Sequence, residues 1–208
     1  MNTLHFNNKK TEKRVVLVFT FWGLIIYLLG YSKLYVSVPR PFFGMTAFLT
    51  IAVLLISYFQ ITSFKRFLNS VPLRYLALFQ AWRIFAGMLF LSFRNQLPAA
   101  FIHEAPYGDI VTGFMGIAVF VFLQNKMGYF IVNIVGLADL IIALSIGLYY
   151  ALSGEPKMAP ILSSPLILIP LFGVPIAVLT HVISFSQLIK AKKKNEIIWK
   201  PGRAIVGM

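Results

Sequence analysis

The chain has 208 residues, of which 59% are hydrophobic and 12% are charged, and its mean hydropathy is +0.81. Because soluble domains are about half apolar and about one quarter charged, this composition excludes an ordinary soluble domain and indicates an integral membrane protein. The formal net charge is +13, and the absence of cysteine excludes disulfides, iron–sulfur clusters, thiolate metal sites and cysteine nucleophiles.

Six hydrophobic runs follow one another along the chain. Each is long enough to form a helix across the hydrocarbon core of a bilayer, which takes about 20 residues. The sequence therefore predicts an all-α, polytopic membrane protein with about six transmembrane helices. This transmembrane domain, at residues 15–189, is predicted between basic tails at residues 1–14 and 190–208. The six runs lie at residues 15–36, 42–63, 75–94, 107–124, 128–151 and 165–189.

The basic residues follow a topological pattern. Fourteen of the nineteen lie on the side of the N-terminus, in the two tails and in the loops after the second and fourth runs, and four lie on the other side. The positive-inside rule then predicts a multi-pass protein of a bacterial-type cytoplasmic membrane, with both termini in the cytoplasm. The polybasic segment at residues 190–194 is expected to meet anionic lipid headgroups, so the predicted partner is the lipid bilayer and not nucleic acid.

Ionisable side chains distinguish the later runs from the first two, whose interiors have none. Arg83, Asp139 and His181 each lie well inside a run. A charged side chain at the centre of a transmembrane helix costs about 2.5–3.5 kcal/mol on insertion scales. Each of these residues therefore needs a partner or a function.

Five polar side chains are predicted in the cytoplasmic half of the bilayer, from a rise of about 1.5 Å per residue counted from the cytoplasmic helix ends. They are Gln80, Arg83, Asn133, Asp139 and His181. One interpretation is a structural ion pair between Arg83 and Asp139, with the other three side chains satisfying the remaining hydrogen bonds. The other is that Asp139 or His181 changes protonation during a cycle, or that Arg83 holds an anionic substrate or headgroup.

A second polar group lies at residues 97–109, which lead into the start of the fourth run, and two prolines and a glycine there predict a loop on the outer side. This outer-loop group consists of His103, Glu104 and Asp109. Three ligands fall short of the four of a structural zinc site, and Asp109 is well placed as an N-cap or first-turn acid of the fourth helix. No metal site is predicted.

Small residues and prolines predict local features of two helices. One face of the fourth helix carries only small side chains, which favours close packing against another helix. These residues recur at intervals of four and are Gly108, Thr112 and Gly116. Pro170 and Pro175 lie inside the sixth run. They predict a kink or local unwinding there, because proline lacks the amide that a helix requires.

These patterns favour a transporter, channel or sensor for a small solute or proton, with the Arg, Asp and His layer at its centre. Two alternatives stay open: a non-catalytic membrane subunit of a larger complex, and a membrane-embedded enzyme that acts on a lipid or another hydrophobic substrate. No catalytic residue is predicted, the balance is against an enzyme, and the sequence identifies no cofactor. A homo-oligomer or a complex with other membrane subunits is compatible with each interpretation.

Overall fold

The computed structural model describes residues 2–198, and residues 199–208 of the predicted C-terminal tail lie outside the described part. The described residues form helices joined by short connections, with no strand among them, so the all-α prediction is confirmed. The elements are α1 (Asn2–Tyr31), η1 (Leu34–Ser37), α2 (Arg40–Gln60), α3 (Thr62–Asn69), α4 (Leu73–Phe79), α5 (Trp82–Ser92), α6 (Ala99–Val121), α7 (Lys126–Leu152), η2 (Pro156–Leu162), η3 (Ile169–Gly173) and α8 (Val174–Ile198).

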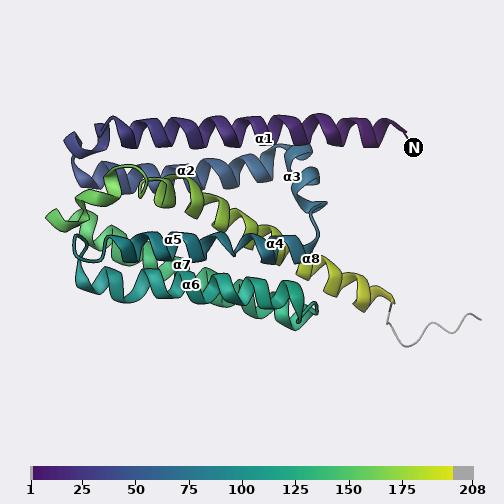
Figure 1. Ribbon diagram of the computed structural model, residues 1–208. Coiled ribbons are helices and arrows are strands. Elements are labelled where there is room, and N and C mark those ends of the chain that lie inside the picture. The colour runs from purple at the N-terminus through teal and green to yellow at the C-terminus, as the bar shows by residue number, and fades with distance from the viewer. Residues whose placement is uncertain (1, 199–208) are drawn as a thin grey trace, which may run out of the picture.

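The helices form an elongated bundle (Figure 1). Helix α1 lies along one edge with α2 beside it, and α6 lies at the opposite edge. Helix α5 packs against α6, α6 packs against α7, and α8 packs against both α2 and α7. The N-terminal end of α1, the short helix α3 and the last turns of α8 lie at the same end of the bundle (Figure 1).

Five helical stretches are long and apolar enough to span a membrane. The fourth predicted run, at residues 107–124, falls in α6, which is not among them. Helix α6 has 23 residues, and its first half carries two acids and a histidine, which lower its hydropathy. The five stretches are Lys10–Tyr31, Arg40–Gln60, Leu73–Ser92, Lys126–Leu152 and Ile169–Lys190.

The segment at residues 97–109 is helical from Ala99 onward, so the prediction of a loop there is wrong. Pro98 lies immediately before α6, where its missing amide costs nothing because the first amides of a helix have no intrahelical partner. Pro106 lies inside the helix and is fully buried, with its carbonyl oxygen against Gly87 of α5. Tertiary packing therefore overrides the local turn signals.

The small residues of α6 contact two neighbouring helices. Gly116 lies against the carbonyl oxygen of Ala77 in α4, whereas Gly108 lies against the carboxylate of Asp139 in α7, and a side chain at either glycine would collide. Thr112, between them, is fully buried. Helices α4, α5 and α7 thus converge on α6.

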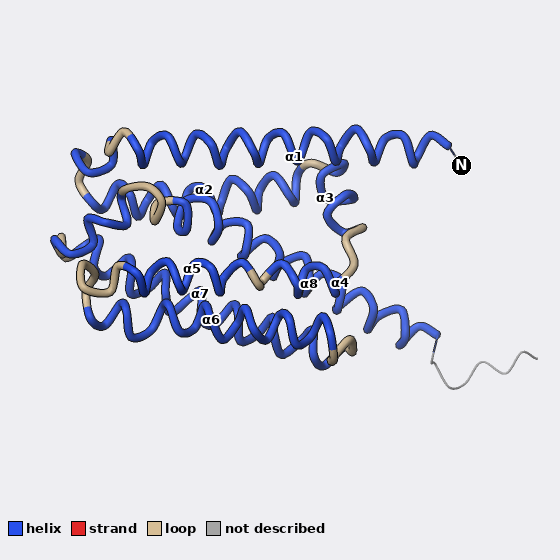
Figure 2. Tube along the Cα trace, viewed as in Figure 1, coloured by secondary structure: helices blue, strands red, loops and turns tan. Residues whose placement is uncertain are grey.

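Two predicted helices contain irregular turns. Residues 169–173 form a π-helical turn, η3, which includes Pro170 and leads directly into α8. The third predicted run is divided into α4 and α5 by a short non-helical stretch, which is visible as a tan interruption in Figure 2. The two interruptions lie close together, since Gly173 of η3 lies against the ring of Trp82 at the start of α5.

Candidate functional site

Arg83 lies at the start of α5, and its side chain is 0% exposed. Its Nε donates to Oδ1 of Asp109 in α6 at 2.7 Å, and its Nη1 donates to the carbonyl oxygen of Gly136 in α7 at 3.0 Å. Its Nη2 donates to Oδ2 of Asp139, which is also in α7. One guanidinium therefore joins three helices through two carboxylates and a carbonyl. We refer to Arg83, Asp109 and Asp139 as the charge cluster.

The structure places Asp109 differently from the sequence-based prediction. It does not cap the fourth helix in an outer loop but lies inside α6, ten residues and about 15 Å beyond Ala99, with 8% of its side chain exposed. His103 and Glu104 are exposed near the start of α6, so only Asp109 of the predicted outer group joins the cluster. Among the described side chains, no three His, Asp or Glu residues are grouped so that they could hold a metal ion.

The backbone changes its hydrogen-bonding pattern next to Arg83. Between α4 and α5, amides bond to carbonyls three residues back: Gln80 N to Ala77 O at 3.0 Å, and Arg83 N to Gln80 O at 3.0 Å. A 3₁₀-type turn within a helical stretch often marks a functional or strained position. Here it carries Gln80 and Arg83, both of which are buried.

Neutral hydrogen bonds extend the buried polar region to α8. Nδ1 of His181 lies 2.9 Å from Oδ1 of Asn133, and Nε2 of Gln80 donates to Oγ1 of Thr180 at 2.9 Å. Because an amide oxygen can only accept, Nδ1 of His181 carries the proton in this arrangement. The five residues predicted as a polar layer thus lie in two adjacent groups, with Arg83 and Asp139 in one and Gln80, Asn133 and His181 in the other.

Gly136 connects the two groups. Its carbonyl oxygen accepts from Arg83, and its missing side chain leaves the space that the His181 ring occupies. A Cβ atom at this position would lie 2.7 Å from Cε1 of His181 and 2.8 Å from Cγ2 of Thr112, closer than real Cβ contacts. Glycine is therefore needed here for the histidine to lie beside the charge cluster.

Three buried polar atoms of this region accept or donate no hydrogen bond within the described part of the chain: Oε1 of Gln80, Oγ1 of Thr112 and Nε2 of His181. Most buried polar groups in proteins are paired, and an unpaired one costs about 1–3 kcal/mol. Oε1 of Gln80 can only accept a hydrogen bond, Nε2 of His181 is an acceptor in this tautomer, and the hydroxyl of Thr112 can both donate and accept.

Two threonines provide a matched test of this hydrogen bonding. Thr112→Val is expected to keep or raise stability, by up to about 1–3 kcal/mol, because it removes an unpaired buried hydroxyl. Thr180→Val is expected to lower stability by a similar amount of about 1–3 kcal/mol, because it removes the acceptor of Gln80. Thermal unfolding of the purified variants in detergent checks both, and equal effects of the two substitutions would contradict the assignment.

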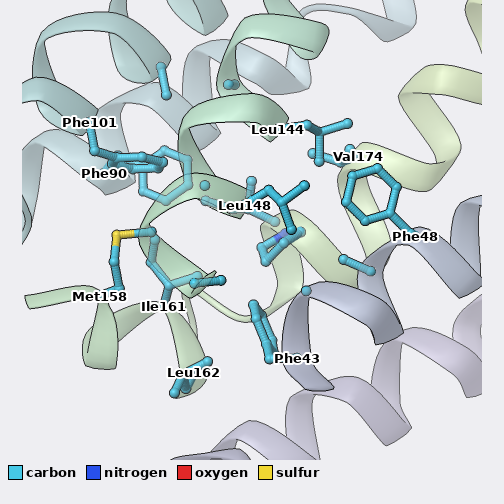
Figure 3. Close-up of a pocket in the computed structure, with 18 of the residues that line it drawn as sticks. Phe43, Phe48, Phe90, Phe101, Leu144, Leu148, Met158, Ile161, Leu162 and Val174 are labelled. Carbon is cyan, nitrogen blue, oxygen red and sulfur yellow. The ribbon is translucent and has the colours of Figure 1, made fainter. Parts of the chain in front are cut away.

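A cavity of about 100 Å³ lies beside the charge cluster, bordered by α2, α5, α6, α7, the turns η2 and η3, and the start of α8. Except for Arg40 and Asp109, every residue that lines it is apolar or glycine. Figure 3 shows rings of Phe43, Phe90 and Phe101 around this space. Asp109 alone belongs both to the cavity lining and to the charge cluster.

Sequence reasoning missed three components of this site: the second carboxylate, the carbonyl of Gly136 and the cavity. Two local signals are present: Asp109 lies within the fourth predicted run, and a glycine stands near each acid, since Gly108 precedes Asp109 and Gly136 lies three residues before Asp139. Bare backbone beside an acid on a helix permits close approach by a neighbouring helix. That signal does not identify the neighbour.

Residues 40–189 match the model of a family described as a domain of unknown function (DUF8737). The match includes every residue of the charge cluster and of the cavity lining, whereas α1 precedes it. The comparison with curated proteins gives no match, and the comparison with solved structures gives none.

Proposed function

The chain belongs to the DUF8737 family, whose description carries no activity, and we propose that it is a multi-pass membrane protein that moves or senses a proton or a small solute at the charge cluster.

The observation that carries this proposal is the ratio of charges in the cluster. One guanidinium contacts two carboxylates, so the cluster holds one negative charge in excess when both carboxylates are ionised. A net charge is costly in surroundings of low dielectric constant. One proton, or another small cation, cancels it. Binding and release of that cation give the two states that a transport or sensing cycle needs, and buried acids and histidines are the usual proton relays within membranes.

A six-helix arrangement in the membrane is part of the proposal. Helix α6 is long enough to cross, and the acid that lies deepest in it, Asp109, is buried against Arg83 instead of facing lipid. The N-terminal end of α1, α3 and the last turns of α8 lie at one end of the bundle (Figure 1), and basic residues are concentrated in these segments. The positive-inside rule supports a cytoplasmic location for that end and for both termini.

The test is proton movement in proteoliposomes that contain the purified full-length protein. A pH-sensitive dye inside the vesicles reports proton entry when a potassium gradient and an ionophore impose a membrane potential. Asp139→Asn is expected to abolish protein-dependent, pH-dependent proton entry while the protein stays folded, because asparagine keeps the acceptor oxygen but cannot take up the proton. Asp109→Asn is expected to do the same.

Glu104→Gln is the matched control, since it also neutralises an acid of α6 but at an exposed position. It is expected to behave as the wild type. If both aspartate variants retained wild-type proton movement, the proposal would be wrong, and the charge cluster would be a structural ion pair of the kind expected in a non-catalytic membrane subunit.

A further inference from the structure

The walls of the cavity exclude most polar ligands. Its lining is apolar over five helices and two irregular turns, so only hydrocarbon or aromatic groups can lie against it without losing hydrogen bonds to water. A dry apolar cavity of about 150 Å³ accepts benzene in other proteins. The cavity here is smaller, at about 100 Å³, so it admits at most one small ring or a short alkyl group.

One carboxylate faces this apolar space. Asp109 lines the cavity and accepts from Arg83 through Oδ1, whereas no residue in the described part of the chain donates to its Oδ2. Its side chain is otherwise buried. A ligand that enters the cavity therefore meets a carboxylate oxygen that lacks a donor, at a site whose charges sum to minus one.

Arg40, the second polar residue of the lining, lies near one end of the bundle, whereas Asp109 lies deeper. Arg40 is the first residue of α2 and donates to the carbonyl oxygen of Gly154. Helices α2 and α6 begin at the same end of the bundle (Figure 1), and Asp109 is about 15 Å along α6 from that end. A cation is thus disfavoured beside Arg40 and favoured deeper in the cavity, beside Asp109.

We propose that the cavity binds a small lipophilic amine in its protonated form, with the apolar group against the phenylalanine-lined wall and the ammonium group on Asp109. This inference rests on the proposed function and names the solute class. The ammonium donates to the free oxygen and cancels the excess negative charge of the cluster. The hydroxyl of an alcohol would donate to Oδ2 of Asp109 but would leave the excess negative charge of the cluster. A carboxylate ligand would be repelled by that charge. The aromatic rings of the lining also attract cations.

Gly147 offers a place to add bulk at the wall of the cavity without disturbing the fold. It lines the cavity on α7, and a Cβ atom there would meet nothing within 4 Å among the described residues. Gly147→Leu therefore adds bulk to open space and also replaces glycine in a helix, which favours folding. Ser145→Leu is the matched control, because it places the same side chain two residues away at an exposed position outside the lining.

The experiment is isothermal titration calorimetry at pH 7 on the full-length protein in detergent. The probes are benzylamine, benzyl alcohol and phenylacetate, which share a ring and differ in charge. Benzylamine is expected to bind at least about tenfold more tightly than benzyl alcohol, and phenylacetate is expected not to bind. Gly147→Leu is expected to remove benzylamine binding, Ser145→Leu to retain it, and Asp109→Asn to abolish the preference for the amine.

Equal binding of the three probes, or benzylamine binding that survives Gly147→Leu, would overturn the inference. An absence of benzylamine binding by the wild-type protein would also overturn it. Proton movement in vesicles separates this failure from that of the proposed function. If proton movement depends on Asp139 while benzylamine does not bind, the amine inference alone is wrong. If proton movement does not depend on either aspartate, the proposed function is wrong as well.

Discussion

Arg83→Ala is expected to destabilise the protein by about 3–5 kcal/mol, the cost of removing one partner from a buried ion pair. The substitution leaves two buried carboxylates without a counter-charge and the carbonyl oxygen of Gly136 without its side-chain donor. Because the total stability of a domain is about 5–15 kcal/mol, a loss of this size should sharply reduce the amount of folded protein that accumulates. Membrane accumulation and thermal unfolding in detergent measure it.

Two further variants identify the cause of this loss. The triple variant Arg83→Ala, Asp109→Asn, Asp139→Asn removes the guanidinium together with both negative charges, so it is expected to recover part of the lost stability. Arg83→Lys keeps the charge but has no planar fork to reach three acceptors, so it is expected to be intermediate. If Arg83→Ala unfolded at the wild-type temperature, the charge cluster would not hold these helices together.

Gly87→Ala is expected to cost about 1–3 kcal/mol through overpacking, although alanine normally favours a helix. A Cβ atom at Gly87 would lie 2.5 Å from the carbonyl oxygen of Pro106 and 2.7 Å from Cγ1 of Ile110. The isoleucine can change its rotamer, but the carbonyl belongs to the backbone of α6 and can move only with the helix. The unfavourable contact therefore outweighs the gain in helix propensity.

Gly147→Ala is the control for this effect, because α7 leaves open space at that position. It is expected to raise stability by up to about 1 kcal/mol, the usual gain from replacing glycine within a helix. Thermal unfolding of both variants in the same detergent gives the comparison. A loss of stability in both would mean that the glycines act through something other than the spacing between α5 and α6.

The helical class could be predicted because it depends on composition and on the length of apolar runs, both of which are local properties. The importance of Arg83 was equally visible, since an arginine among apolar residues needs a counter-charge wherever it is buried. Asp139, predicted as its partner, does contact it in the structure. The irregular turn at Pro170 followed from the chemistry of proline in the same local way.

Asp109 shows why the rest could not be predicted. Its role depends on whether residues 97–109 form a loop or a helix, and the prolines there favour a loop by local rules. The packing of Pro106 against Gly87 decides otherwise, and that contact joins two helices whose proximity no single sequence reveals. The cavity is harder still to predict, because its lining comes from segments between Arg40 and Val174.

Arg83 precedes both of its partners in the chain, with Asp109 following 26 residues later and Asp139 following 56 residues later. A ribosome therefore completes α5 before either carboxylate exists. In the membrane protein that we propose, a helix with an unpaired arginine carries an insertion penalty of about 2.5–3.5 kcal/mol. The stretch Leu73–Ser92, which α4 and α5 form together, is thus expected to insert stably only after α6 and α7 have been synthesised and their carboxylates can pair with Arg83. The order of synthesis then governs how this bundle assembles.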